Sequence, residues 1–426
     1  MSEVKVNKIS PRSGTDVQLG DSGDTITVPS GATFDASNAT TTLPATVVTT
    51  DGSQTLTNKT IDASQLTDAT VTPAKLAYNY NQFRNIIING DMSIAQRGTS
   101  ATGLGNGDFG YFTVDRWKFI ESGAPTYEFT QTQDTDVPTG QGFATSLKMD
   151  CTTAQGSLAA ADQLRISHLI EGQNLQYLKK GTSSAESLTV SFWVKSVKTG
   201  TYICELKDDN NRTISKSYTI DSASTWEKKT ITFAGDTTGT IDNDNTAGLE
   251  ISWWLVAGTT FSSGTLQTSW DSLTNANRAV GQVNLADNTA NECYITGVQL
   301  EAGTTASDFE FLPVDVNLQR CYRYFQRFPA FDTSGNDFSV IGNGYNNSST
   351  LAFANIEHYV PMRTKPTLSY SSLGGLRLHI GGTAKSITDL TVDSNISNPS
   401  ISFTIFSSAC SMAIKSSKIN MLSSGT

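Results

Sequence analysis

Short runs of alternating apolar and polar residues, each ended by turn-forming residues, limit most what this chain can fold into. Every second residue of Leu188–Val194 is apolar, and Leu249–Leu255 repeats the pattern. A period of two places the apolar residues on one face of a β-strand. Segments rich in Gly, Asn and Asp, such as 208–211 and 235–239, supply turns between such strands. We therefore predict a mainly β chain with a β-sandwich over residues 85–312.

The N-terminal segment has few of the side chains that build a core. Phe34 is the only aromatic residue of residues 1–77. Such a segment cannot offset its ordering entropy by burying its own surface. We expect copies of the same chain, or a neighbouring structural protein, to complete its core; a disordered linker is the alternative. Pro73–Arg84 predicts a short helix, since proline suits a first helical position. Residues 1–84 are thus assigned to an attachment and trimerisation stalk.

A second helix is predicted between the sandwich and the C-terminal part. Within Asp315–Phe328, apolar residues recur at helical spacing, and Asp315 suits an N-cap. These residues are Leu318, Cys321, Tyr322 and Phe325. Residues 313–329 are therefore assigned to a connecting helix. Residues 330–426 return to short strands and predict a smaller β-sandwich that forms a tip domain.

Composition argues against several classes of function. The net charge is -10, and an acidic surface repels nucleic-acid backbones. No apolar run approaches the ~18 residues of a membrane-spanning helix, and Met1–Pro11 lacks the apolar core of a secretory signal. The five cysteines include no Cys-x-x-Cys pair, so zinc and redox motifs are not expected. We predict no nucleic-acid partner and no membrane insertion.

The sequence shows no catalytic motif. Its three histidines have no metal-ligand spacing, and no Gly-rich loop leads into Lys-Ser or Lys-Thr. Carboxylate pairs for glycoside cleavage meet in space rather than in sequence, so location alone suggests candidates. They are Asp115, Glu121, Asp162 and Glu171. Solvated turn carboxylates are the simpler interpretation, and we predict that the chain is not an enzyme.

In six short segments, here called phrases, the order of the residues is more informative than the amino-acid composition. In chain order they are Ser53–Asp62, Asn85–Gly98, Thr113–Trp117, Ser191–Ser196, Ile295–Gly303 and Val360–Thr367. Together they resemble proteins of bacteriophage tail fibres, cyanophage fibres among them. The resemblance implies a homotrimer in the virion tail, assembled in the host cytoplasm. It also implies that the N-terminal stalk binds a tail, baseplate or adaptor protein.

Asn89-Gly90-Asp91-Met92 also resembles the opening of carbohydrate-binding modules with a galactose-binding-like jelly-roll fold. Ile295–Val298 occupies the place of their closing strand, where an acidic pair often helps to hold a structural calcium ion. The matching positions here carry no carboxylate. Asp91 and Glu301 remain as hard-oxygen ligands for a possible calcium site. No other cofactor is expected.

Aromatic residues outside the core are the candidates for stacking on a sugar ring. Trp193 and Trp254 lie opposite the apolar faces of their predicted strands. Burial against a loop or a neighbouring subunit is the alternative for both. Tyr345 and Tyr370 lie in Asn-, Ser- and Gly-rich stretches of the tip, a composition typical of adaptable binding loops.

The sequence thus predicts a tail-fibre adhesin that binds a host-surface glycan or lipopolysaccharide without catalysis. Two alternatives stay open. One is a short tailspike that degrades polysaccharide, and the other is a fibre or baseplate component with no receptor role.

Overall fold

The structure, a computed structural model, describes residues 83–329 without a gap. The other described residues are 339–346, 351–370, 376–380, 383–392, 400–407, 414–416 and 418–423, together with 25, 27, 30, 31 and 33. After Arg327, side chains are described only for Phe353, for 357–367 and for Ser369. Met1–Val71 and Thr72–Thr426 form two separate units. The helix predicted over Pro73–Arg84 lies outside the described residues up to its last two, as does nearly all of the predicted stalk.

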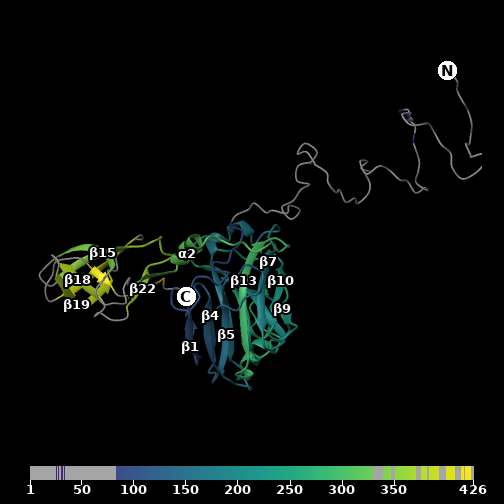
Figure 1. Ribbon diagram of the computed structural model, residues 1–426. Coiled ribbons are helices and arrows are strands. Elements are labelled where there is room, and N and C mark those ends of the chain that lie inside the picture. The colour runs from purple at the N-terminus through teal and green to yellow at the C-terminus, as the bar shows by residue number, and fades with distance from the viewer. Residues whose placement is uncertain are drawn as a thin grey trace, which may run out of the picture. The chain divides into compact units, whose positions relative to one another are not determined.

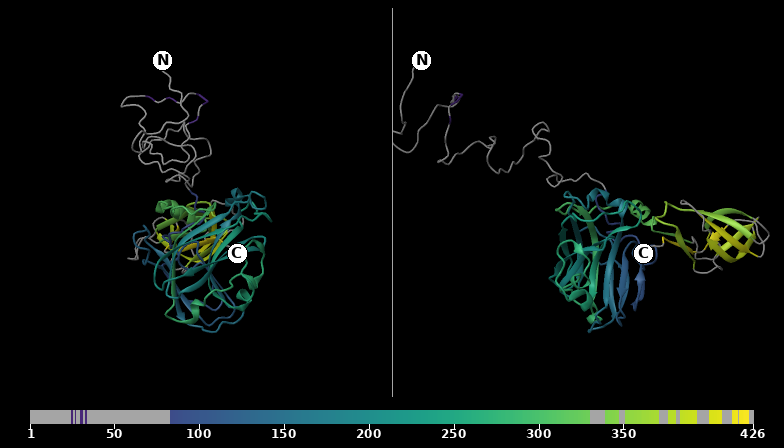
Figure 2. Two further views of the ribbon diagram at one scale, coloured as in Figure 1. Left: turned by 90° about the vertical axis from the view of Figure 1, so that its right-hand side faces the viewer. Right: turned by 180° about the vertical axis from the view of Figure 1, so that it is seen from behind.

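Two antiparallel sheets build the central body (Figures 1 and 2). The first has the order β1 (Ser100–Gly105), β4 (Glu128–Asp134), β5 (Ser146–Thr153), β13 (Glu292–Ala302), β7 (Leu188–Ser196) and β10 (Glu227–Phe233). The second has the order β12 (Asp271–Ser272), β9 (Arg212–Ile220), β8 (Gly200–Asp208), β11 (Ala247–Ala257), β6 (Gln163–Glu171), β3 (Lys118–Ser122) and β2 (Phe109–Gly110). The chain passes repeatedly between the sheets, as in jelly rolls. The predicted mainly β fold with a central sandwich is confirmed.

The sandwich core follows the alternation seen in the sequence. Residues 188, 190, 192 and 194 of β7 are buried in one apolar cluster with residues 249, 251, 253 and 255 of β11. Trp117 and Trp253 are among its largest buried side chains, with ring centroids 5.5 Å apart. Cys151, Cys204 and Cys293 are free thiols inside this core. Burial of large apolar side chains between the sheets is the main force that holds them together.

Helices are short and lie between strands. The described ones are α1 (Thr259–Ser262), α2 (Val314–Tyr322) and the 3-10 turns η3 (Gly172–Asn174), η4 (Gln176–Leu178), η5 (Asn275–Asn277) and η6 (Leu285–Asp287). None of these has the length and apolar character to span a membrane. The connecting helix was predicted to reach Phe328, which is wrong, because β14 (Phe325–Pro329) pairs instead with β22 (Lys418–Ser423). Asp315 lies in the first turn of α2, and Pro313 occupies the N-cap.

The C-terminal strands form a barrel and a small sheet. The closed barrel has the order β15 (Ser339–Asn346), β16 (Leu351–Glu357), β20 (Ser400–Ser407), β19 (Thr383–Val392), β18 (Leu376–Ile380) and β21 (Ile414–Ser416). β22 pairs with β14 on one side and with β17 (Pro366–Tyr370) on the other. The predicted C-terminal sandwich is therefore corrected to a barrel. Closing the sheet on itself leaves no unpaired strand edge.

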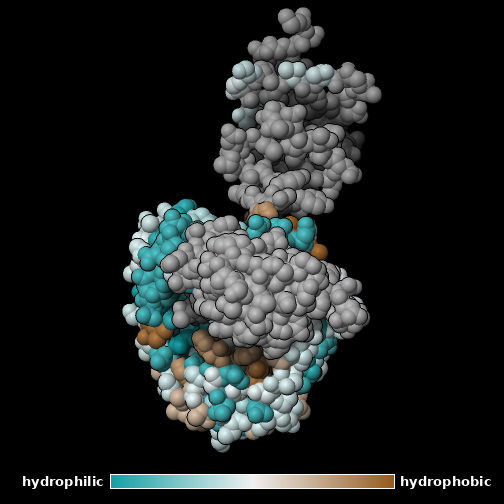
Figure 3. All heavy atoms as spheres, turned by 90° about the vertical axis from the view of Figure 1, so that its left-hand side faces the viewer, coloured by the Kyte–Doolittle hydropathy of each residue, from teal (hydrophilic) through white to brown (hydrophobic). Residues whose placement is uncertain are grey.

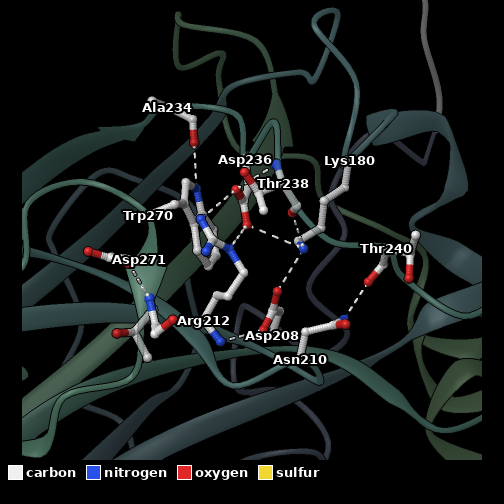
Figure 4. Close-up of polar contacts among 12 residues, drawn as sticks. Lys180, Asp208, Asn210, Arg212, Ala234, Asp236, Thr238, Thr240, Trp270 and Asp271 are labelled. Atoms are coloured by element: carbon white, nitrogen blue, oxygen red, sulfur yellow. Dashed lines mark hydrogen bonds and ion pairs between the residues drawn. The ribbon is translucent and has the colours of Figure 1, made fainter.

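A network of four charged side chains joins three loops at one end of the sandwich (Figure 4). Arg212 donates two hydrogen bonds to the Asp236 carboxylate, of 2.8 and 3.1 Å. Lys180 Nζ lies 2.7 Å from Asp208 and 3.3 Å from Asp236. Asp208 and Asp236 are almost fully buried, so each carboxylate depends on these cations for its charge.

Replacing Asp236 with alanine is expected to lower the free energy of unfolding by about 3 kcal/mol, because Arg212 and Lys180 lose a buried counter-ion. Chemical denaturation followed by circular dichroism measures this loss. Asp209, an exposed carboxylate in the adjoining turn, is the matched control, and its alanine variant should stay within about 0.5 kcal/mol of the parent. Equal losses for the two variants would contradict a special role of the network.

Candidate functional site

Asn89 links two of the specific sequence phrases. Its Nδ2 donates hydrogen bonds of 2.9 Å to the carbonyls of Ile94 and Asp115, and its Oδ1 accepts one of 2.9 Å from the Ile94 amide. Trp117 Nε1 donates to the Asn89 carbonyl at 2.9 Å. From α2, Asn317 Nδ2 donates to Asp91 Oδ1 at 3.1 Å. These contacts fix Asp115–Trp117, the segment that leads into β3.

Gly90 is required where this turn meets β13. A Cβ atom at this position would lie 2.1 Å from the Val298 carbonyl oxygen, closer than any real contact. The close approach allows the Val298 amide to donate to the Gly90 carbonyl at 2.9 Å. The opening phrase is therefore held against the closing strand of the sandwich.

Arg116 lies at the centre of the segment fixed by Asn89. Its φ of 74° is in the left-handed region. A residue other than glycine in this conformation is strained by about 1–3 kcal/mol, because its Cβ atom crowds the backbone. Its guanidinium stacks 3.5 Å from the Tyr324 ring centroid and donates to the Leu169 carbonyl. The buried Nε has no hydrogen-bond partner among the described residues. Backbone strain and an unused donor in one residue point to a functional position.

A cavity of about 390 Å³ lies beside Arg116. Its lining comes from the segment before β3, the end of β6, the start of β11 and the residues after α2. The aromatic members are Tyr111, Phe112, Tyr324 and Phe325, and the charged members are Arg97, Asp115, Arg116, Glu171 and Arg363. Apolar walls with a few convergent polar groups are typical of ligand sites.

The two carboxylates of the cavity have pKa values shifted in opposite directions. Burial raises the pKa of Asp115 to about 6, against the lowering effect of Arg97. Asp115 accepts a 3.1 Å hydrogen bond from the Gln96 amide and a 3.4 Å contact from Arg97. Burial also opposes ionisation of Glu171, yet its pKa is lowered because Arg323 donates two hydrogen bonds of 2.7 and 2.8 Å.

The raised pKa of Asp115 predicts a pH dependence of stability. An unfolded aspartate has a pKa of about 3.9, so between about pH 4 and 6 the folded chain keeps a proton that the unfolded chain releases. Stability should therefore fall as pH rises through this window, by roughly 2–3 kcal/mol more in the parent than in Asp115→Asn. Denaturation midpoints at several pH values measure this. Asp150→Asn, at a partly exposed carboxylate on β5, is the control and should keep the parent's pH profile; an unchanged profile for Asp115→Asn would contradict the assignment.

A strip of polar side chains continues from the cavity along the outer face of the second sheet. The register places Leu169, a cavity residue, opposite Glu250, and Ser167 opposite both Lys118 and Ser252. Lys118 is only 3% exposed, and its ammonium lies 3.7 Å from the centroid of the Phe109 ring. Burial lowers the pKa of Lys118 to about 8. The cavity and the strip together form the candidate site.

Arg165 marks the far end of the strip. It donates to Glu250 Oε1 at 2.6 Å and to the Ser252 hydroxyl at 3.0 Å. Beyond it, the segment that contains α1 covers the outer face, because Phe261 packs on Trp254 and the Ser215 amide donates to the Gln267 carbonyl. The covering segment therefore lies beyond Arg165, on the side away from the cavity.

Large apolar side chains are exposed at several places in the described part of the chain. They are Phe83, Phe109, Tyr177, Phe311, Val314 and Tyr359. On the face shown in Figure 3, hydrophobic side chains lie at several places on a mostly hydrophilic surface. Phe109, at 57% exposure, belongs to the strip, since its ring covers Lys118.

The structure changes the interpretation of the predicted stacking residues. Trp254 is fully buried: it packs on Phe261 with ring centroids 5.4 Å apart, and its Nε1 donates to Glu205 at 2.9 Å. It offers no surface to a sugar, so this candidate is corrected to the alternative of burial against a loop. Trp193 is partly exposed on the outer face of the first sheet, away from the cavity. Tyr345 and Tyr370 lie in β15 and β17, and their side chains are outside the described ones.

The two proposed calcium ligands have separate protein partners. Asp91 accepts from Asn317, whereas Glu301 accepts from the Ser307 amide at 2.8 Å and from Gln299 Nε2 at 3.0 Å. Among the described residues, no group of three or more His, Cys, Asp or Glu side chains is arranged to hold a metal ion. Calcium binding stays a prediction.

The four carboxylates named from the sequence separate into two places. Asp115 and Glu171 line the cavity. Glu121 accepts from the Gly107 amide, and Asp162 accepts from the Ala159 amide at 2.8 Å, so both stabilise turns. The sequence did not indicate Tyr111, Arg116 or Lys118 as site residues. The phrase Thr113–Trp117 was the available signal, since it contains Arg116.

Comparison with known proteins finds similar structures but no family. No protein-family description matches this chain, and no curated protein matches it. The enzymatically active domain of tailspike protein 4 from bacteriophage CBA120 is 13% identical, with a TM-score of 0.29 and coverage of 51% of this chain and 21% of that one. The matched region therefore spans about a fifth of the length of the tailspike domain.

Carbohydrate-binding modules are also similar in structure. A family 11 module of a cellulosomal cellulase of Clostridium thermocellum is 12% identical, with a TM-score of 0.25 and coverage of 48% of this chain and 97% of the module. TmCBM61 in complex with β-1,4-galactotriose is 10% identical, with a TM-score of 0.24 and coverage of 51% and 99%. Similarity at this level does not assign the chain to a family.

Proposed function

We propose that this chain is a non-catalytic glycan-binding protein and that the cavity beside Arg116 is its sugar site. The observation that carries the proposal is the convergence of four aromatic residues with arginine and carboxylate groups around one cavity. A sugar ring presents an apolar face that packs on aromatic rings, and its hydroxyls need fixed polar partners. Tyr111 is suited to the first task, and Arg116 with its unused Nε is suited to the second.

The biological setting belongs to the same proposal. The phrases similar to phage tail fibres support a virion adhesin that binds a glycan or lipopolysaccharide of the host surface. They also support a homotrimer held to the tail, baseplate or an adaptor by its N-terminal stalk. Light scattering of the full chain should give the mass of a trimer, and a monomer at low concentration would contradict the assembly.

Substitution of Tyr111 tests the site. Binding to an array of host-surface glycans identifies a ligand, and calorimetric titration then compares Tyr111→Ala with the parent. We expect at least a tenfold loss of affinity, because an aromatic stacking partner contributes about 1 kcal/mol or more beyond its buried area. Trp193→Ala is the matched control on the opposite sheet. Loss of binding with Trp193→Ala and not with Tyr111→Ala would show that the sugar binds to the first sheet and not in the cavity.

Polysaccharide cleavage is the second candidate. Asp115 and Glu171 line one cavity and have pKa values shifted apart, as an acid and a base require. Both carboxylates, however, are engaged by the protein, through Gln96 and Arg323 respectively. We therefore propose glycan binding, and not polysaccharide cleavage, as the first candidate function. Release of new reducing ends from host polysaccharide, lost in both Asp115→Asn and Glu171→Gln, would establish cleavage instead.

A further inference from the structure

Within the described part of the chain, two cations of the candidate site have no counter-ion bound to them. Arg97 is paired with Asp115, and Arg165 with Glu250. Arg116, in contrast, makes one hydrogen bond to a carbonyl and a ring contact, and it forms no ion pair with any residue that the structure describes. Lys118 has ring contacts only, with neither a hydrogen bond nor an ion pair among the described residues. Asp115 lies near Arg116 and Glu250 near Lys118, but neither carboxylate contacts its neighbouring cation.

Both unpaired cations are buried. Arg116 is 6% exposed and Lys118 is 3% exposed. A buried charge without a counter-ion is costly, and aromatic contacts compensate only part of that cost. The chain as a whole has a net charge of -10, so an excess of positive charge here is local and not a property of the surface in general. Such a site favours a ligand that carries negative charge.

Tyr111 connects the two cations to one ligand position. It lines the cavity with Arg116, and the Lys118 ammonium lies 6.0 Å from the centroid of its ring. Phe109, the other ring over Lys118, is largely exposed, so a single surface side chain covers the ammonium on that side. A sugar stacked on Tyr111 would therefore lie beside Arg116 in the cavity and near the Lys118 ammonium.

We propose that the bound glycan is acidic and that its carboxylate or phosphate group is recognised by Arg116 and Lys118. This inference rests on the proposed function of the cavity and adds the class of ligand. Charge-assisted hydrogen bonds from a guanidinium and an ammonium are stronger than those to neutral hydroxyls. The acidic group would displace the Phe109 ring from the ammonium and supply the counter-ion that the protein lacks.

Paired ligands test the inference. One arm compares a uronate-containing oligosaccharide with the same oligosaccharide after carboxyl reduction, and the other compares a phosphorylated lipopolysaccharide core with its dephosphorylated form. Affinities are measured by calorimetry on the parent chain, Lys118→Met and Lys228→Met. Methionine keeps most of the apolar length of lysine without its charge. Lys228 is an exposed residue of β10 on the first sheet and is the matched control.

We expect the charged form to bind the parent at least tenfold more tightly than the neutral form in one arm, which identifies the acidic group. Lys118→Met should reduce this difference, because only Arg116 then remains to bind the acidic group, Lys228→Met should keep it, and added salt should reduce it. Equal affinity for charged and neutral forms in both arms would overturn the inference and leave glycan binding intact. Absence of binding by every form would overturn the proposed function together with the inference.

Discussion

Replacement of Trp117 with alanine is expected to lower the free energy of unfolding of the sandwich by about 4 kcal/mol. This is one of the two largest losses of stability expected from a single substitution in this protein. The ring is fully buried and lies 5.5 Å from the rings of both Trp253 and His168. Its Nε1 also donates to the Asn89 carbonyl. Alanine therefore leaves a large cavity and removes one of the two hydrogen bonds that the Asn89 carbonyl accepts, the other coming from the Met92 amide.

Denaturant unfolding followed by far-ultraviolet circular dichroism measures the loss without depending on tryptophan fluorescence. Trp117→Phe keeps one buried aromatic ring while it removes the hydrogen bond and the smaller part of the indole volume, so its expected loss is only about 2 kcal/mol. Trp226→Ala is the control, since Trp226 is only partly buried at the edge of the first sheet. A similar loss at Trp117 and Trp226 would contradict the central position of Trp117 in the core.

Replacement of Glu205 with alanine should have an effect of comparable size, about 4 kcal/mol, because it breaks a buried ion pair from one side. Arg278 donates hydrogen bonds of 2.7 and 2.9 Å to the two carboxylate oxygens, and Trp254 Nε1 donates another of 2.9 Å. Both members of the pair are buried. Without Glu205, the guanidinium and the indole N–H lose their acceptor under the covering segment that contains α1.

A double variant shows whether charge is the cause. Glu205→Met combined with Arg278→Met should recover most of the loss, since neither charge is then left buried alone. Glu186→Ala, in the exposed pair with Lys179, should change stability by less than about 1 kcal/mol. Thermal and chemical denaturation of the same variants provide the measurement. A double variant as unstable as Glu205→Ala would show that lost packing, and not an unpaired charge, dominates.

The sequence predicted those features that depend on local pattern. The alternation in Leu188–Val194 and in Leu249–Leu255 correctly placed each strand with one face in the core, because side chains alternate along any β-strand. The phrase Thr113–Trp117, which the sequence offered only as part of a resemblance, contains Arg116 of the cavity. Homotrimer formation and attachment to a phage tail remain predictions.

Pairing between distant segments decided what the local pattern could not. Helical spacing continued to Phe328, yet the helix ends at Tyr322 because Phe325–Pro329 pairs with Lys418–Ser423. Trp254 satisfied the pattern of an outward-facing strand residue but is buried by Phe261 of α1 and by Arg278, whose guanidinium lies over its ring. In both cases a residue or strand outside the short stretch of sequence used for the prediction determined the local structure.

By itself, the sequence determined a mainly β chain, the position of its central sandwich and the core face of its strands, since each follows from residues that are neighbours along the chain. Only the tertiary structure decided the closed barrel and the candidate site. The cavity combines Tyr111, Leu169, Asn245 and Tyr324, which come from four separate segments. Its unpaired cations can be recognised only when burial and every possible counter-ion are known, and both are properties of the folded chain.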